Sequence, residues 1–151
     1  MDFAQPTAFL LMGIQACGKT SFYHRHLSAA VHISLDVLRT RGREAKVLDE
    51  CLRGRRSFVV DNTNARREDR RRYIAPAKEG GFLIEGFFFR SRVSEAIRRN
   101  EARPNALPPK AILGTSARLE LPRLAEGFDR LHFVSIGSDG KFLVEEWRDE
   151  V

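Results

Sequence analysis

The chain contains little cysteine, one tryptophan and no long apolar run. Its two cysteines, Cys17 and Cys51, lie far apart, and neither belongs to a CxxC motif or stands near histidines at zinc-ligand spacing. A disulfide framework and a zinc cage are therefore excluded as the basis of the fold. No apolar stretch approaches the roughly 20 residues that a membrane-spanning helix requires. We expect reduced thiols and no membrane partner.

A secretory signal, an internal repeat and an interdomain linker are also missing. The N-terminal sequence MDFAQPTAFLLMG has no basic residue before its apolar stretch, and that stretch runs into a glycine-rich loop instead of a cleavage site. A chain of 151 residues has the length of one domain with one core. We therefore expect a single domain over residues 1–151, located in the cytoplasm.

The charge is unbalanced toward basic residues. Lysine and arginine number 26 against 20 aspartates and glutamates, which gives a formal net charge of +6, and most of the cations are arginines. Arginine forks suit phosphate groups, so an acidic, phosphate-bearing partner is one explanation. The other is that arginine is simply the common surface cation of this chain, because net charge alone identifies no partner.

Apolar stretches of strand length alternate with longer amphipathic stretches, as in βαβ units around a parallel sheet. This pattern predicts a three-layer α/β sandwich whose central, mostly parallel five-stranded sheet is formed by residues 8–12, 31–35, 57–61, 82–89 and 131–136. Helices are expected over residues 18–28, about 43–52, and 66–78. The tail IGSDGKFLVEEW has a turn signal at Asp139-Gly140 and predicts a terminal hairpin or an edge strand.

The glycine-rich loop after the first strand carries the clearest motif. GIQACGKT fits GxxxxGK[ST] and lies between a buried strand and a helix, the context in which this P-loop pattern binds ATP. We expect main-chain amides to surround the β-phosphate, Lys19 to bridge β and γ oxygens, and Thr20 to bind magnesium. The alternative is an ordinary glycine turn before a helix. The candidate ATP-binding residues of the loop are Gly13, Ile14, Gln15, Ala16, Cys17, Gly18, Lys19 and Thr20.

Two aspartates follow strands, at the sheet edge where ligands bind in α/β proteins. Asp61, in SFVVDNTN, is suited to bind magnesium together with Thr20, or it belongs to an Asx turn that caps the next helix. Asp36, in VHISLDVLR, is suited to take the hydroxyl proton of a phosphoryl acceptor, with Arg39 on the same helix face to hold a phosphate. The alternative is Asp36 as a helix N-cap and Arg39 as a solvated residue.

Residues 92–118, between the fourth and fifth strands, have the character of a lid. A basic helical stretch that contains Arg98, Arg99 and Arg103 is followed by a proline-rich turn and a second short helical stretch. The step from Arg99 to Arg103 is i to i+4 and aims two guanidinium groups the same way, so that a lid closed over ATP is expected to neutralise the transferring phosphoryl group.

Other polar residues are assigned no chemistry. The arginines of residues 66–72 alternate with acidic residues and are expected to form a solvated helix face. The histidines form no ligand pattern; they are His24, His26, His32 and His132.

Together these motifs resemble the kinase module of polynucleotide 5′-hydroxyl kinases, within the wider group of P-loop kinases that includes zeta-type toxins. The resemblance spans nearly the whole chain. Its landmarks are GIQACGKT, Asp36 with Arg39, VVDNTN, the pair Arg99 and Arg103, and LAEGFDRLHFV. It implies that Asp36 is the general base for the 5′-hydroxyl, that Arg39 contacts a phosphate on the acceptor side, and that Arg103 contacts ATP phosphates.

The loop departs from the family's usual GxPGSGKS, because Gln15 replaces the proline and Ala16-Cys17 replaces Gly-Ser. Both flanking glycines, the lysine and the hydroxyl are kept, so we still expect ATP binding. No DxDGT-type phosphatase motif occurs. The sequence predicts an ATP- and magnesium-dependent kinase for the 5′-hydroxyl of a polynucleotide. Two alternatives stay open: a kinase for a sugar, nucleoside, antibiotic or nucleotide-sugar, and an ATP-binding module with weak ATPase activity.

Overall fold

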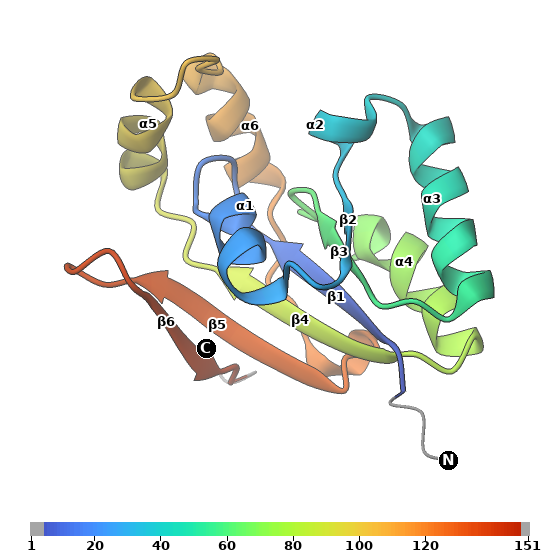
Figure 1. Ribbon diagram of the computed structural model, residues 1–151. Helices are drawn as coiled ribbons and strands as arrows, with labels where there is room; N and C mark the ends of the chain where they lie inside the picture. Colours follow the sequence, from blue (N-terminus) through green and yellow to red (C-terminus); the bar gives the residue numbers. More distant parts are fainter. Residues whose placement is uncertain (1–4, 149–151) are drawn as a thin grey trace.

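The computed structural model describes residues 5–148, which form one sheet covered by helices on both faces (Figure 1). The strand order is β2-β3-β1-β4-β5-β6, and all neighbours are parallel except β5 and β6. The strands are β1 (Thr7–Met12), β2 (Val31–Ile33), β3 (Phe58–Asp61), β4 (Leu83–Phe89), β5 (Arg130–Ile136) and β6 (Phe142–Glu146). The predicted three-layer α/β fold is confirmed.

The sheet has six strands where the sequence predicted five. The additional strand is β6, the second strand of the expected terminal hairpin, which pairs with β5. Asp139 and Gly140 lie in the turn that reverses the chain, and β6 then runs antiparallel to β5 as the edge strand. Within residues 5–148, no helix is long and apolar enough to cross a bilayer.

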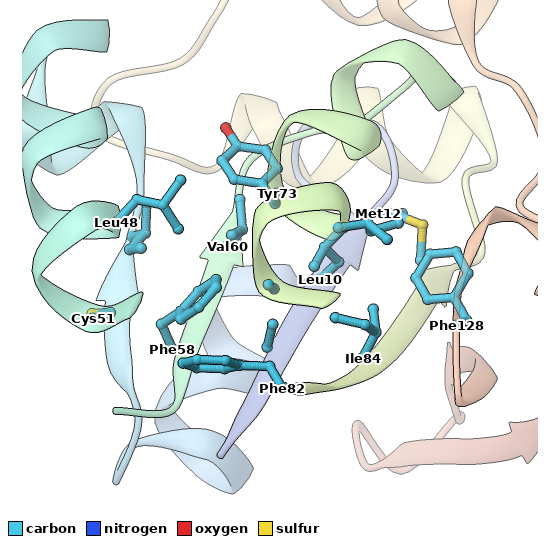
Figure 2. Close-up of a cluster of buried hydrophobic side chains, with 14 of the residues drawn as sticks. Leu10, Met12, Leu48, Cys51, Phe58, Val60, Tyr73, Phe82, Ile84 and Phe128 are labelled. Atoms are coloured by element: carbon cyan, nitrogen blue, oxygen red, sulfur yellow. The ribbon is translucent and has the colours of Figure 1, made fainter. Parts of the chain in front are cut away.

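The strand pattern explains the two cores. Because side chains alternate along a strand, Leu10 and Met12 of β1 pack on one face of the sheet and Leu11 packs on the other. The first core contains residues of α3 (Arg41–Gly54) and α4 (Arg67–Glu79), and Figure 2 shows part of it. The second contains residues of α1 (Lys19–Phe22), the π-helical turn η1 (Tyr23–Leu27), α5 (Val93–Glu101) and α6 (Pro109–Arg118).

The carboxyl ends of the parallel strands meet at one edge, where the loops that matter for function gather. The P-loop, the four-residue α2 (Leu35–Leu38) and the α5–α6 hairpin all lie at this end of the sheet (Figure 1). The lid expected over residues 92–118 is this hairpin. Its connection is held by the buried side chain of Asn100, whose amide donates to the Leu107 carbonyl at 2.6 Å and accepts from the Leu107 amide at 2.9 Å.

Arg70 corrects the expectation of a solvated helix face on α4. Its side chain is fully buried and forms a two-point ion pair with Glu126, at 2.8 and 3.0 Å, in the short helix η2 (Leu124–Glu126). A third nitrogen donates to the carbonyls of Asn64 and Glu120, both at 3.0 Å. Arg70 therefore joins the chain that leaves the lid to the turn after β3. The sequence hid this role because Glu126, the ion-pair partner, lies 56 residues away.

We predict that Arg70→Met lowers the free energy of unfolding by about 3–5 kcal/mol, because it leaves the Glu126 carboxylate without its buried partner. Urea unfolding followed by circular dichroism measures the change. Arg71→Met is the matched control, since Arg71 is the next residue of the same helix and is exposed. Equal losses for the two variants would contradict the structural role of Arg70.

Candidate active site

The P-loop turns through backbone conformations that glycine adopts most easily. Gly13 has φ 150° and Gly18 has φ 102°, while Ala16 between them has φ 61°. A Cβ on Gly13 would lie 2.8 Å from the Cys17 sulfur, so the turn also requires glycine for space. The loop is anchored at its start, where the Gly13 amide donates to the Thr63 carbonyl at 3.0 Å.

Lys19 lies inside this turn. Its ammonium donates to the carbonyls of Gly13 at 2.9 Å and Ile14 at 2.8 Å and stands 3.5 Å from the Cys17 sulfur. The side chain is buried, with 8% of the residue exposed. A buried cation in a loop of main-chain groups is what an anionic phosphate tail needs.

The structure brings Thr20 and Asp61 together. The Thr20 hydroxyl donates to Asp61 Oδ2 at 2.7 Å, and Asp61 is buried at the end of β3. A hydroxyl and a carboxylate are hard oxygen ligands, so the pair fits magnesium, which also takes phosphate oxygens and water.

His32 is a member of this site that the sequence analysis missed. Its Nε2 lies 2.9 Å from Asp61 Oδ2, and its ring stacks on Tyr23 with centroids 4.1 Å apart. Burial, with a smaller contribution from the Asp61 carboxylate, raises the pKa of Tyr23. His32 thus contacts the same oxygen of Asp61 as Thr20 does, and Tyr23 supports the His32 ring. No spacing in the sequence relates His32 to Asp61, because they meet only through the pairing of β2 with β3.

Asp61 does not cap the next helix, which was the alternative to its role in metal binding. Helix α4 begins after Arg66, and the Arg66 amide is satisfied by the Asp69 carboxylate at 3.1 Å. The capping group of α4 is therefore Asp69, and the Asp61 carboxylate bonds Thr20 of the P-loop instead.

Asp36 and Arg39 lie at the same edge of the sheet, on and after α2. Ser34 is the N-cap residue of α2, and Asp36 is exposed in its first turn, so the N-cap alternative for Asp36 is wrong. The helix ends at Leu38, and Arg39 has φ 76°. The two side chains therefore do not share a helix face as predicted, and within the described part of the chain neither makes a hydrogen bond or ion pair.

A buried polar network holds α2 in place. Asn62 accepts from the Leu35 amide at 2.9 Å and donates to Glu44 at 2.9 Å and to the Tyr73 hydroxyl at 3.2 Å. Glu44 is 2% exposed and also accepts from Tyr73 at 2.9 Å and from Arg41 at 2.9 Å. Burial and the Glu44 carboxylate raise the pKa of Tyr73, so its hydroxyl stays protonated and donates. We call these four residues, Arg41, Glu44, Asn62 and Tyr73, the Glu44 network.

The lid contacts the P-loop through Gln15. Its amide nitrogen donates to the Thr115 hydroxyl on α6 at 2.8 Å, and Thr115 donates in turn to the Ala111 carbonyl at 3.1 Å. Because the Thr115 proton is used for Ala111, the Gln15 nitrogen must face Thr115. The Gln15 oxygen is buried and has no protein partner among the described residues. The residue that replaces the usual proline thus joins the nucleotide loop to the lid.

The lid arginines do not lie as a helical pair. Arg99 is in α5, where it forms an ion pair with Glu95 at 3.9 Å, but α5 ends at Glu101. Arg103 follows in an exposed turn, with its amide bonded to the Asn100 carbonyl at 3.0 Å. The predicted i to i+4 step is therefore wrong, and the structure shows no contact of either side chain with Lys19, Thr20 or Asp61.

Comparison with known proteins gives consistent matches. Residues 9–122 match the AAA domain family AAA_33. The bifunctional polynucleotide phosphatase/kinase of Schizosaccharomyces pombe is 26% identical over 132 residues, which cover 83% of this chain and 32% of that protein. The chain thus spans about a third of the length of this curated relative.

Solved structures share the fold. A gluconokinase from Sinorhizobium meliloti 1021 superposes with a TM-score of 0.62 at 19% identity, over 89% of this chain and 85% of that one. The AvrRxo1-ORF1:-ORF2 complex with ATP gives a TM-score of 0.68 at 16% identity, over 93% and 57% of the two chains. At these identities the likeness concerns the fold alone. Since the family match covers most of the chain and includes the P-loop around Lys19, this protein belongs to the AAA domain family and has an ATP-binding P-loop.

Proposed function

We propose that this protein is a kinase, which transfers the γ-phosphate of magnesium-bound ATP to the 5′-hydroxyl of a polynucleotide. We call α2 and the start of α3, residues 35–43, the acceptor corner. The observation that carries the proposal is that the exposed Asp36 lies in this corner, at the same edge of the sheet as the P-loop with Lys19. Figure 1 shows α2 and the P-loop at this edge. Arg39, Arg41 and Arg43 follow within a few residues and give this corner a positive charge suited to a polyanion. The match to a polynucleotide phosphatase/kinase supports the choice of acceptor.

On the nucleotide side, the loop residues Gly13 to Thr20 surround the β-phosphate with main-chain amides, and Lys19 stabilises charge on the β and γ oxygens. Thr20 and Asp61 hold the magnesium ion. When bound, the ion neutralises charge on the phosphate oxygens. His32 keeps the Asp61 carboxylate in position through the 2.9 Å contact.

On the acceptor side, Asp36 takes the proton of the 5′-hydroxyl while that oxygen forms a bond to the γ-phosphorus and the bond to the ADP oxygen breaks. Arg39 binds a phosphate of the acceptor. Arg99 and Arg103 approach the γ-phosphoryl group when the lid closes, and their charge offsets the negative charge of the transition state.

The acceptor assay separates this proposal from its alternatives. Incubation with γ-labelled ATP and a single-stranded oligonucleotide should label a 5′-hydroxyl end and leave a matched 5′-phosphate end unlabelled. Labelling of a small metabolite such as gluconate, with none on either oligonucleotide, would contradict the proposal and support a small-molecule kinase, in line with the gluconokinase fold. ATP binding without transfer to any acceptor would indicate a binding module.

Asp36→Asn should reduce kcat by about 10²–10⁴-fold, because the amide takes no proton from the hydroxyl. ATP affinity should stay within about twofold of the parent value, since Asp36 has no contact with the P-loop. Rapid-quench transfer and ATP titration measure the two quantities. Asp49→Asn serves as control, because Asp49 is an exposed carboxylate on α3 that pairs only with Arg53. A parallel loss of ATP affinity in Asp36→Asn would instead make Asp36 a magnesium ligand.

Lys19→Met should abolish ATP binding and turnover together, because the buried ammonium is the cation of the phosphate loop. Isothermal titration with ATP and the labelling assay test this. Lys46→Met, which removes an exposed lysine of α3, should bind ATP as the parent does. Unchanged titration and turnover in Lys19→Met would refute nucleotide binding at this loop.

A further inference from the structure

Arg41 stands out because its guanidinium is anchored on one side only. Its NH1 nitrogen donates to Glu44 at 2.9 Å and to the Tyr73 hydroxyl at 3.0 Å. A guanidinium has five N–H donors in a rigid fork, so the edge formed by Nε and NH2 is left. Within residues 5–148 this edge has no protein partner, and the side chain is 54% exposed.

The anchor is rigid and buried. Tyr73 packs its ring into the first core and directs its hydroxyl away from the other labelled side chains, as Figure 2 shows. That hydroxyl contacts Arg41 and Glu44, and Asn62 bonds both Glu44 and Tyr73. A long side chain that is fixed at its tip loses little further entropy when it binds a ligand, which favours binding.

The same network sets the position of Arg41 relative to the proposed base. Asn62 bonds the Leu35 amide, and Leu35 precedes Asp36 in α2. The chain of hydrogen bonds runs from α2 through Asn62 and Glu44 to Arg41. Arg41 lies five residues after Asp36, and its guanidinium is held by contacts that also hold α2.

We propose that the free edge of Arg41 binds a backbone phosphate of the acceptor strand and so makes the kinase select a polynucleotide over a phosphate-free alcohol. This inference rests on the proposed function and deepens it. The Nε–NH2 edge matches two phosphate oxygens, which is the bidentate geometry that arginine provides. The ion pair with Glu44 does not by itself explain the position of Arg41. That pair uses only the NH1 nitrogen and leaves the Nε–NH2 edge exposed at the acceptor corner.

The first test pairs protein variants with altered substrates. In a 5′-hydroxyl oligonucleotide, a neutral methylphosphonate replaces the first, second or third internucleotide linkage in turn. For the parent enzyme we expect one of these replacements to raise KM roughly 10- to 100-fold, the loss of a charged hydrogen bond. Arg41→Ala should raise KM for the unmodified strand by a similar factor. The methylphosphonate that raises KM for the parent should then cause no further rise in KM for this variant. The KM for ATP should not change.

Two variants act as controls for charge and folding. Arg43→Ala removes an exposed arginine from the same helical turn, and its KM should rise less than about threefold and stay sensitive to the replacement. Arg41→Lys keeps a cation opposite Glu44, so the protein stays folded, yet it lacks the planar fork and should lose the coupling. If Arg41→Ala and Arg43→Ala change KM equally, Arg41 contributes only to the general positive charge of the corner, and the proposal is overturned.

Glu44→Gln distinguishes an anchored Arg41 from simple charge attraction, because the two roles predict opposite changes in the KM for the oligonucleotide. The substitution makes the corner more positive, so a general electrostatic role predicts a lower KM for the oligonucleotide, whereas loss of the anchor predicts a higher one. We expect the higher KM. If the parent labels oligonucleotides but no linkage couples to Arg41, this inference alone is refuted. If the parent labels no oligonucleotide, the proposed function fails and this inference fails with it.

Discussion

The site depends on residues 61–64, which are the last residue of β3 and the turn after it. Each of these four residues fixes a different element. Asp61 bonds the Thr20 hydroxyl at the start of α1, and Asn62 bonds the main chain of α2. The Thr63 carbonyl receives the first amide of the P-loop, and the Asn64 amide donates to the Leu11 carbonyl near the end of β1 at 2.7 Å. These four consecutive residues thus hold the P-loop, α2 and the central strand β1 together, so a displacement of this turn would shift all three.

The lid is connected to the same arrangement from two directions. Gln15 joins the P-loop to α6, and Arg70 joins the turn after β3 to the chain that leaves α6. A proline at position 15 has no side-chain donor for Thr115, so the departure from the usual loop adds a contact between lid and nucleotide loop. The buried oxygen of Gln15 has no protein partner among the described residues, so only the nitrogen of this side chain is used in the contact.

The sequence predicted those features that depend on local pattern. The alternation of buried strands and amphipathic helices was sufficient for the layers, and the spacing of Gly13, Gly18 and Lys19 was sufficient for the P-loop. Asp61 was placed correctly because carboxyl ends of parallel strands share one edge. The contact of His32 with Asp61, the burial of Arg70 and the Glu44 network depend on which strands and helices become neighbours, and spacing along the chain carries no such information.

Helix ends were the second source of error. The pairing of Arg99 with Arg103 and of Asp36 with Arg39 assumed helices that continue, yet α5 ends at Glu101 and α2 ends at Leu38. Both arginines that follow the helix ends are exposed, where few contacts fix their conformation.

Arginine in this basic chain has at least two distinct uses, and the number of satisfied nitrogens distinguishes them. In Arg70 all three nitrogens bind protein groups and the side chain is fully buried, so its charge serves the fold. In Arg41 one nitrogen is held by buried partners and the opposite edge is left exposed. Anchoring removes the conformational freedom that weakens most surface arginines as ligands. An arginine anchored in this way is pre-organised for a ligand at its exposed edge, whereas Arg70 has no free edge to offer.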